Sequence, residues 1–313
     1  MIAEKTVKTL EFDKILQAVA SFAVLEKTKE AIARCSFETD LKEVNSLLDK
    51  TEEAYKLLYE HSVSGIFYFA DVSEELDRAD VGGTLNPAEL LRIADNLKSA
   101  RTIRGAIRSV TDESIVVLRE ISESLYLNEE FEKEIRDKII SEDEISDTAS
   151  PKLYSIRKSI KDINARIRNQ LNSYMRTGFN KYLQESVVTM RQGRYVIPVK
   201  SEYRSQVKGF IHDQSSSGAT VFIEPEVMME LNNDLKKAIF DEKEEIYKIL
   251  HDLTVKVSFM TDAIRDNAEK LAVIDGFFAR AEYSFKNKCV RPSVNKNGNT
   301  DVRSARHPLI AED

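Results

Sequence analysis

The chain has 313 residues, of which 42% are hydrophobic and 32% charged, and its formal net charge is −7. This length allows roughly two or three domains, and the absence of a run of about 18 apolar residues predicts that no segment spans a membrane. The N-terminus lacks the apolar stretch of a signal peptide. Cys35 and Cys289 are far apart and in no CxxC pair, which argues against a disulfide or a metal site and for a reducing, cytoplasmic location.

Residues 1–125 are predicted to form a helical core bundle. Residues 86–89 read Asn-Pro-Ala-Glu, in which Asn can cap a helix, Pro suits its first position and Glu completes a capping box. Asp40 followed by Glu43 resembles a second capping box. The aromatic stretch 61–69 is predicted to be a buried loop or a packed strand.

Residues 126–186 are predicted to hold outbound helices that end in one long helical arm. Ser150-Pro151 has the pattern of a cap followed by the first helical residue. The apolar residues that follow are spaced alternately three and four apart, at Leu153, Ile156, Ile160, Ile163 and Ile167. We expect this helix to run to about Leu183, which makes an arm of roughly 45–50 Å.

Residues 226–288 are predicted to form a returning helical arm and further core helices. Its apolar residues show the same spacing, at Ile246, Leu250, Leu253, Val257, Met260 and Ile264. Leaving either apolar stripe in water costs about 25 cal/mol per Å². The two arms are therefore predicted to pack antiparallel within the chain; the alternative is that each arm forms a homodimeric coiled coil.

Residues 187–225 are predicted to form a small β-rich unit at the tip of the paired arms. Four short strands are predicted, at 187–191, 194–200, 203–214 and 219–225. Gln192-Gly193 and the serine-rich stretch 215–218 are the expected hairpin turns. Pro198 predicts an edge strand or a bulge, because it cannot donate a ladder hydrogen bond.

Basic residues are concentrated around this unit, although the whole chain is acidic. Between positions 152 and 208 there are thirteen Lys and Arg residues against three acidic ones. Arg and Lys neutralise phosphates, so this block predicts a polyanionic partner held through its backbone. The candidate nucleic-acid-binding residues are Arg191, Arg194, Lys200, Arg204 and Lys208, interleaved with Tyr195 and Tyr203, together with Arg176 and Lys181. The alternative is that these cations lie on solvated helix faces beside acidic neighbours.

No set of catalytic residues emerges from the sequence. His212, Asp213 and Ser215 lie on one predicted strand and its turn, where neighbouring side chains alternate between faces and cannot converge as a triad. The four histidines show no metal-ligand spacing, so we expect no metal site. The serine-rich turn could form an anion nest, but it lacks the GxxxxGK[ST] pattern of a P-loop.

Several motifs together resemble the MutS family of DNA-clamping ATPases. They are LEFDKIL near the start, GGTLNPAELLRIADNL at 82–97, the segment from RYVIPVK to FIEP, LNNDL just after it, and ARHPLI near the end. They are similar to the second bacterial branch of the family, which lacks mismatch-reading domains and carries a C-terminal Smr domain.

The resemblance implies a mostly α fold in which a helical core bundle carries long antiparallel lever helices with a β-rich clamp at the tip. Arg306, His307 and Pro308 match the motif that opens the ATPase domain, so residues 289–313 are expected to begin that domain. No Walker or Smr motif occurs in this sequence, so ATP and Mg²⁺ are implied only for a longer parent protein.

The resemblance also implies function. It points to suppression of homologous recombination and rescue of stalled or collided ribosomes by a homodimer, with double-stranded or branched DNA, or the ribosome and its rRNA, as partner. A helical scaffold that binds proteins along its coiled-coil arms is the alternative.

Overall fold

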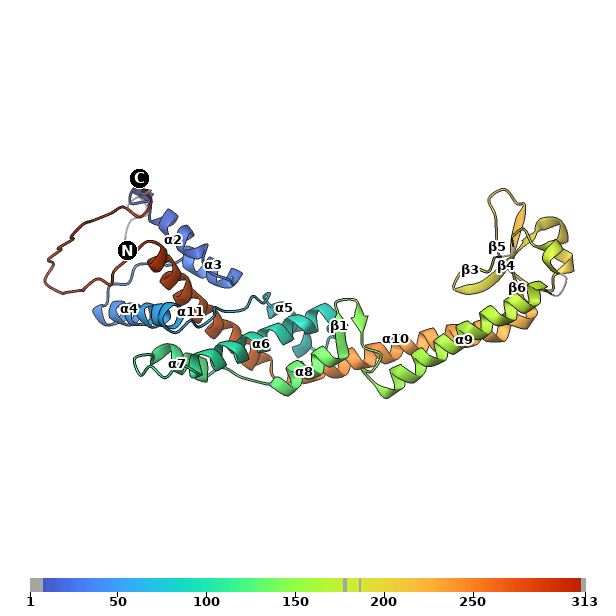
Figure 1. Ribbon diagram of the computed structural model, residues 1–313, viewed down its shortest axis with the longest axis horizontal. Coiled ribbons are helices and arrows are strands. Elements are labelled where there is room, and N and C mark those ends of the chain that lie inside the picture. Colours follow the sequence, from blue (N-terminus) through green and yellow to red (C-terminus); the bar gives the residue numbers. More distant parts are fainter. Residues whose placement is uncertain (1–7, 177–178, 186, 311–313) are drawn as a thin grey trace. The chain divides into compact units, whose positions relative to one another are not determined.

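In the computed structural model, which describes residues 8–176, 179–185 and 187–310, the chain divides into two compact units (Figure 1). Unit 1 comprises Met1–Glu144 and Leu253–Asp313, and unit 2 comprises Ile145–Asp252. Helices predominate, and the strands form small antiparallel sheets, which confirms the prediction of a mostly α fold with a small β part. Within the described ranges no helix combines the length and apolarity needed to cross a membrane.

Unit 1 is a helical bundle assembled from two separate stretches of the chain. Its helices are α2 (Phe12–Ala20), α3 (Glu26–Ala33), α4 (Leu41–Tyr55), α5 (Ser73–Asp80), α6 (Pro87–Arg108), α7 (Val117–Glu123), α8 (Glu129–Lys138) and α11 (Thr261–Lys286). A π-helical turn, Lys56–Glu60, extends α4. The short strands β1 (Ile139–Ser141) and β2 (Glu144–Ile145) pair where the chain leaves the unit.

The predicted helix start at residues 86–89 is confirmed. The Asn86 side chain accepts a hydrogen bond from the Glu89 amide at 3.0 Å, and the Glu89 carboxylate accepts one from the Asn86 amide at 2.8 Å. Asp40 likewise caps α4 by accepting the amides of Lys42 and Glu43. These bonds satisfy amides that have no carbonyl partner in the first turn of a helix.

The core of unit 1 lies where α4, α6 and α11 meet. The stretch 61–69 forms a loop, and its apolar residues Val63, Ile66 and Phe69 are buried against these helices, so the predicted alternative of a buried loop is correct.

Two buried carboxylates accept hydrogen bonds from amides at the starts of helices that are far from them in the sequence. Asp275 accepts the amides of Val24 and Leu25 before α3, and Glu53 accepts the first amides of α7. Burial raises the pKa of Asp275.

Two long helices form the body of unit 2. Helix α9 (Pro151–Arg176) and helix α10 (Met229–Ser258) lie side by side and run in opposite directions (Figure 1). Ser150 caps α9 by accepting the Leu153 amide at 3.0 Å, as its Ser-Pro start predicts. Helix α9 ends at Arg176 rather than near Leu183, and a 3₁₀ turn covers Phe179–Tyr182. The regular arm is therefore roughly 39 Å long at 1.5 Å per residue.

The apolar seam predicted for α9 is confirmed, and the seam predicted for the returning arm is confirmed at Leu253, Val257 and Ile264, which are buried. Ile163, Ile167 and the next residue in the series, Leu171, are buried on α9. Nearer the start of that seam, Ile246 and Leu250 are partly buried, and Ile249 between them is buried. Polar contacts join α10 to the start of α9 beside this seam, and an apolar pattern cannot reveal them. Glu245 accepts from Ser150 at 2.7 Å, and Glu242 accepts from Arg157 at 2.7 Å.

Residues 226–288 form a long helix followed by a core helix, and the break between the two helices falls inside the periodic apolar pattern. Helix α10 ends at Ser258 and α11 begins at Thr261. Met260, between them, has non-helical angles of φ −132° and ψ 14°. The Thr261 hydroxyl donates to Asp80 on α5 at 2.8 Å, so a tertiary contact fixes the start of α11 where the periodic pattern continues unbroken.

The β-rich unit is a four-stranded antiparallel sheet in the order β3-β4-β6-β5. Its strands are β3 (Thr189–Arg191), β4 (Arg194–Lys200), β5 (Gly209–Gln214) and β6 (Thr220–Pro225). Both predicted hairpin turns are confirmed, and Gln192 and Gly193 adopt φ of 50° and 74°, as a tight hairpin requires. The strand predicted at 203–214 is correct only from Gly209 onward, because Ser201–Gln206 forms a 3₁₀ helix.

Pro198 and Gly209 occupy positions in the sheet where most other residues would differ in hydrogen bonding or in steric fit. Pro198 pairs with Phe222 on β6, but β3 reaches only as far as Val196, so Pro198 lies beyond the end of the β3 ladder. Its carbonyl there accepts the Gln184 amide at 2.9 Å. At Gly209 a Cβ atom would lie 2.1 Å from the carbonyl oxygen of Glu224, so β5 approaches β6 too closely for any side chain at that position.

Candidate nucleic-acid interface

The sequence-predicted cations of unit 2 fall into two groups, which differ in whether a carboxylate neutralises them. Arg194 belongs to the first group, because its Nη1 donates to Glu224 at 2.7 Å and its Nη2 donates to Asn233 at 2.6 Å. Its side chain is 20% exposed and that of Glu224 is 2% exposed. This arginine therefore joins the sheet to α10, and its contact with nucleic acid stays a prediction.

Glu224 is the centre of a polar network that joins the sheet to α10. Besides Arg194 it contacts the Nε2 atom of His212 at 2.5 Å and accepts from the Nδ2 of Asn232 at 2.9 Å. Asn232 also pairs with both backbone groups of Tyr195, at 3.0 Å each. The network gives the LNNDL motif a physical meaning, since its two asparagines fasten β4 and β6 to the first turns of α10.

Arg191 is also neutralised within the chain, although it remains more accessible. Its Nε lies 3.2 Å from Asp213, and its guanidinium lies over the Phe222 ring at 4.2 Å from the ring centre. Because Asp213 pairs with Arg191 while His212 pairs with Glu224, the side chains of these two β5 residues have separate partners. They do not form a triad with Ser215.

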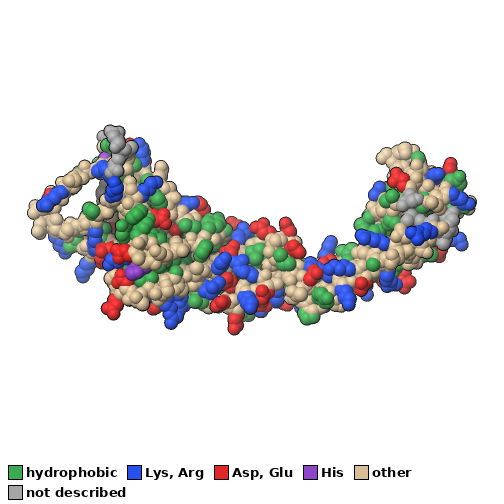
Figure 2. Space-filling model, viewed as in Figure 1, with side chains coloured by type: hydrophobic (Ala, Val, Ile, Leu, Met, Phe, Trp, Pro, Cys, Tyr) green, Lys and Arg blue, Asp and Glu red, His purple; other side chains and the backbone are tan. Residues whose placement is uncertain are grey.

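The second group consists of cations that have no carboxylate partner among the described residues. Lys200 ends β4 and is half-buried, Arg204 lies in the 3₁₀ helix, and Lys208 precedes β5; the last two are exposed. Arg176 is exposed at the end of α9, and Lys181 lies 4.8 Å from the Tyr182 ring centre. Lys and Arg side chains are prominent on the visible face of this end of unit 2 (Figure 2).

The base of α9 shows the opposite situation. Arg157 lies 2.5 Å from Asp147 and 2.7 Å from Glu242, and Lys152 lies 2.9 Å from Glu245. For Arg157 and Lys152, therefore, the alternative interpretation is correct that the cations of the basic block lie beside acidic residues. Further along α9, Arg166 and Arg168 are exposed and have no acidic partner within the described ranges. Their positions off the apolar seam could have identified them from the sequence.

The tyrosines that alternate with the cations are not available for stacking on a ligand. The Tyr195 hydroxyl donates to Asn164 on α9 at 2.8 Å. Tyr203 packs against the core between the sheet and the helices, and its ring lies 5.2 Å from that of Tyr182. Both residues therefore stabilise unit 2.

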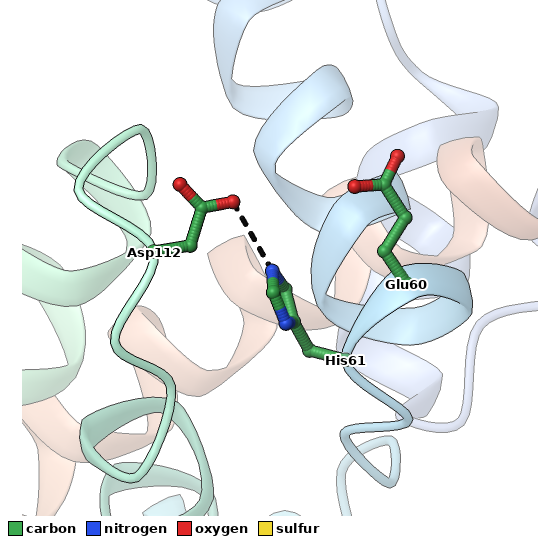
Figure 3. Close-up of side chains that lie close together, drawn as sticks. All are labelled: Glu60, His61 and Asp112. Carbon is green, nitrogen blue, oxygen red and sulfur yellow. Dashed lines mark hydrogen bonds and ion pairs between the residues drawn. The ribbon is translucent and has the colours of Figure 1, made fainter.

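One cluster in unit 1 was not foreseen from the sequence. His61 Nε2 lies 3.1 Å from Asp112, and together with Glu60 these residues place three potential metal-ligating atoms within 4.8 Å of one another (Figure 3). Hydrogen bonds from Ser114, followed by that from His61, hold the pKa of Asp112 far below its ordinary value, and the charge of Lys56 lowers it further. The positive charge near Asp112 comes from Lys56. The hydrogen bond between His61 and Asp112 connects the loop after the π turn to the α6–α7 loop.

The predicted start of the next domain lies in an extended segment of unit 1. Arg306 donates to the carbonyl of Asn287 just beyond α11, and His307 accepts the Leu309 amide through Nδ1 at 3.3 Å. Arg306 and Pro308 line a surface cavity together with residues of α2 and the end of α11. The segment is therefore held against the end of α11.

Comparison with known proteins supports the resemblance seen in the motifs. No family model matches the chain. It is 39% identical over 309 residues to a protein of Ruminiclostridium cellulolyticum, and 41% identical over 308 residues to one of Caldanaerobacter subterraneus subsp. tengcongensis. It is 37% identical over 310 residues to one of Clostridioides difficile. All three are named endonuclease MutS2, and the matches cover 98% of this chain.

The chain is of the MutS2 type. It spans 39% of the length of these relatives. The MutS2 resemblance extends over the core bundle, both long helices and the sheet, so the polar network around Glu224 belongs to the region shared with these relatives.

Proposed function

We propose that unit 2 of this MutS2-type chain grips nucleic acid through its phosphate backbone, with the sheet as a clamp carried by α9 and α10 as levers. The observation that supports the proposal is the set of cations without a carboxylate partner among the described residues: Lys200, Arg204, Lys208 and Arg176. Cations that are already neutralised gain little from a phosphate, whereas free ones release counterions when they bind one.

The partner in this proposal is double-stranded or branched DNA, or the rRNA of a ribosome. The relatives' name, endonuclease, is consistent with a nucleic-acid substrate. The longer protein would act as a homodimer in recombination suppression or ribosome rescue, and ATP with Mg²⁺ would bind outside the part of the protein that this sequence covers.

Charge reversal tests the proposal directly. The variant K200E/R204E/K208E should weaken binding to a duplex, and the slope of log K against log salt should become less negative by about 2–3 units, because each lost phosphate contact removes about 0.9. A matched control is K42E/R108E/K133E, which makes the same change in net charge at exposed, unpaired positions of described unit 1. Equal binding by both variants and the parent would exclude the clamp.

A second candidate is a helical scaffold that binds a protein along α10. Phe240 is 61% exposed and Tyr247 is 58% exposed on this helix, and positions seven apart lie on one helical face. The same titration separates the two functions, since a largely apolar protein contact depends little on salt. Salt-insensitive capture of a protein, abolished by Phe240→Ala, together with no nucleic-acid binding would favour the scaffold.

A further inference from the structure

An exposed aromatic ring on the edge of the sheet suggests which kind of nucleic acid unit 2 receives. Among the strands that the structure describes, β5 pairs only with β6, and Phe210 and Ile211 on it are 60% and 40% exposed. Proteins usually blunt an exposed edge strand with charges or cover it. A bulky aromatic residue there is therefore a candidate for contact with a ligand.

The surroundings of this ring favour an anionic, flat ligand. Phe210 pairs with Glu224 across the β5–β6 ladder, and Lys208 comes two residues before it, immediately ahead of the strand. The Glu224 charge is neutralised from within by Arg194. The carboxylate that pairs with the ring is therefore compensated, and the exposed side chain of Lys208 lies two residues away, at roughly 6–7 Å along an extended chain.

Resting on the proposed function, we propose that Phe210 is a stacking platform for an unpaired base, and that Lys208 holds a phosphate of the same strand. Aromatic side chains stack on bases of any sequence, and neighbouring cations bind the backbone between them. A duplex keeps its base faces stacked inside the helix and offers none to a side chain. The substrate class is therefore nucleic acid with accessible single-stranded nucleotides, as at a junction, a gap or an RNA loop.

The rigidity of the strand suits this role. Any Cβ at position 209 would collide with the Glu224 carbonyl, so β5 is fixed against β6 immediately before the aromatic residue. A ring mounted on a rigid strand loses little conformational freedom when it binds a base.

The experiment compares the 313-residue chain with its variants F210A, F210W and F240A, each titrated with a single-stranded oligonucleotide and with a duplex of the same length. Phe240 is 61% exposed on α10 and is the matched control. We expect F210A to weaken single-strand binding about tenfold, with an unchanged salt slope, because stacking is worth about 1–3 kcal/mol per base and removes no charge. Duplex binding should change less than twofold, F210W should bind like the parent, and F240A should have no effect.

Each other result has a definite meaning. If F210A leaves single-strand binding unchanged, or weakens single strand and duplex equally, the stacking platform is wrong. If K200E/R204E/K208E still weakens both substrates in that case, the clamp itself stands. If the parent binds neither substrate at low salt, both proposals fail. Loss of a protein contact on F210A with no nucleic-acid effect would reassign the ring to protein docking.

Discussion

Replacement of Arg194 by Ala is the sharpest test of the division between structural and free cations. The change leaves the carboxylate of Glu224, 2% exposed, without its guanidinium partner. It also removes the 2.6 Å bond from Arg194 to Asn233. The sheet should therefore lose stability, whereas nucleic-acid binding by molecules that remain folded should change little.

The contacts that survive set the size of the loss. Breaking a buried ion pair by removing one partner costs about 3–5 kcal/mol, because the other charge is left uncompensated. Here Glu224 keeps His212 at 2.5 Å and Asn232 at 2.9 Å, so we expect the lower end of that range, about 3 kcal/mol. R194K should recover little, since a lysine cannot reach Glu224 and Asn233 at once with a planar fork.

Native-state hydrogen exchange of the β4 and β6 amides is the appropriate assay, because it reports the opening of the sheet separately from the rest of the chain. The double variant R194M/E224L removes both charges and should be more stable than R194A, as replacement of a whole buried pair by apolar residues is often tolerated. Unchanged protection in R194A, combined with a fall in nucleic-acid affinity and salt slope, would refute the structural assignment of Arg194.

Three further predictions follow from other parts of the chain. Asn86→Ala should destabilise unit 1 by about 1 kcal/mol in urea melts followed by circular dichroism, and Asn86→Gly by only a few tenths; equal losses would rule out the capping box as the cause. Leu171→Ala, at a fully buried position, should cost about 2–5 kcal/mol by the same assay, whereas Leu171→Met should cost under about 1.5. The lowered pKa of Asp112 means that its contribution is present above its ordinary value near 4 and is lost as the pH falls. Between pH 5 and 3 the parent should therefore lose more stability than Asp112→Asn, and parallel pH profiles would contradict this.

The features predicted correctly from the sequence are those encoded by neighbouring residues. The capping box at Asn86, the Ser150 cap and the Gln192-Gly193 turn each depend on a few adjacent side chains and on local backbone angles. The apolar seam of α9 is likewise local, since residues three and four apart share a helical face. Such signals survive in any tertiary context that keeps the helix or hairpin.

The features that were missed depend on partners far away in the chain. The ion pair Arg157–Glu242, which joins α9 to α10, is separated by 85 residues. The 3₁₀ helix at Ser201–Gln206 follows from the register that joins Lys200 to Thr220 and Gly209 to Pro225, which leaves 201–208 to bridge opposite ends of β6. The cluster of His61 and Asp112 was missed for the same reason, because these two residues are far apart in the sequence.

The candidate site shows the same limit in a form that bears on function. In sequence, Arg157, Arg194 and Arg204 are equivalent members of one basic block. In the structure Arg157 and Arg194 are neutralised by carboxylates, and Arg204 has no acidic partner among the described residues. The free energy of binding a phosphate depends on what a cation gives up to do so, and an arginine that must leave a buried carboxylate gives up more than it gains. The net charge of a sequence segment therefore overestimates the number of cations available to bind phosphate, because some of them are paired with carboxylates in the fold. The salt slope should be set by Lys200, Arg204, Lys208 and those arginines of α9 that have no acidic partner in the described part of the chain, rather than by the thirteen cations of the block.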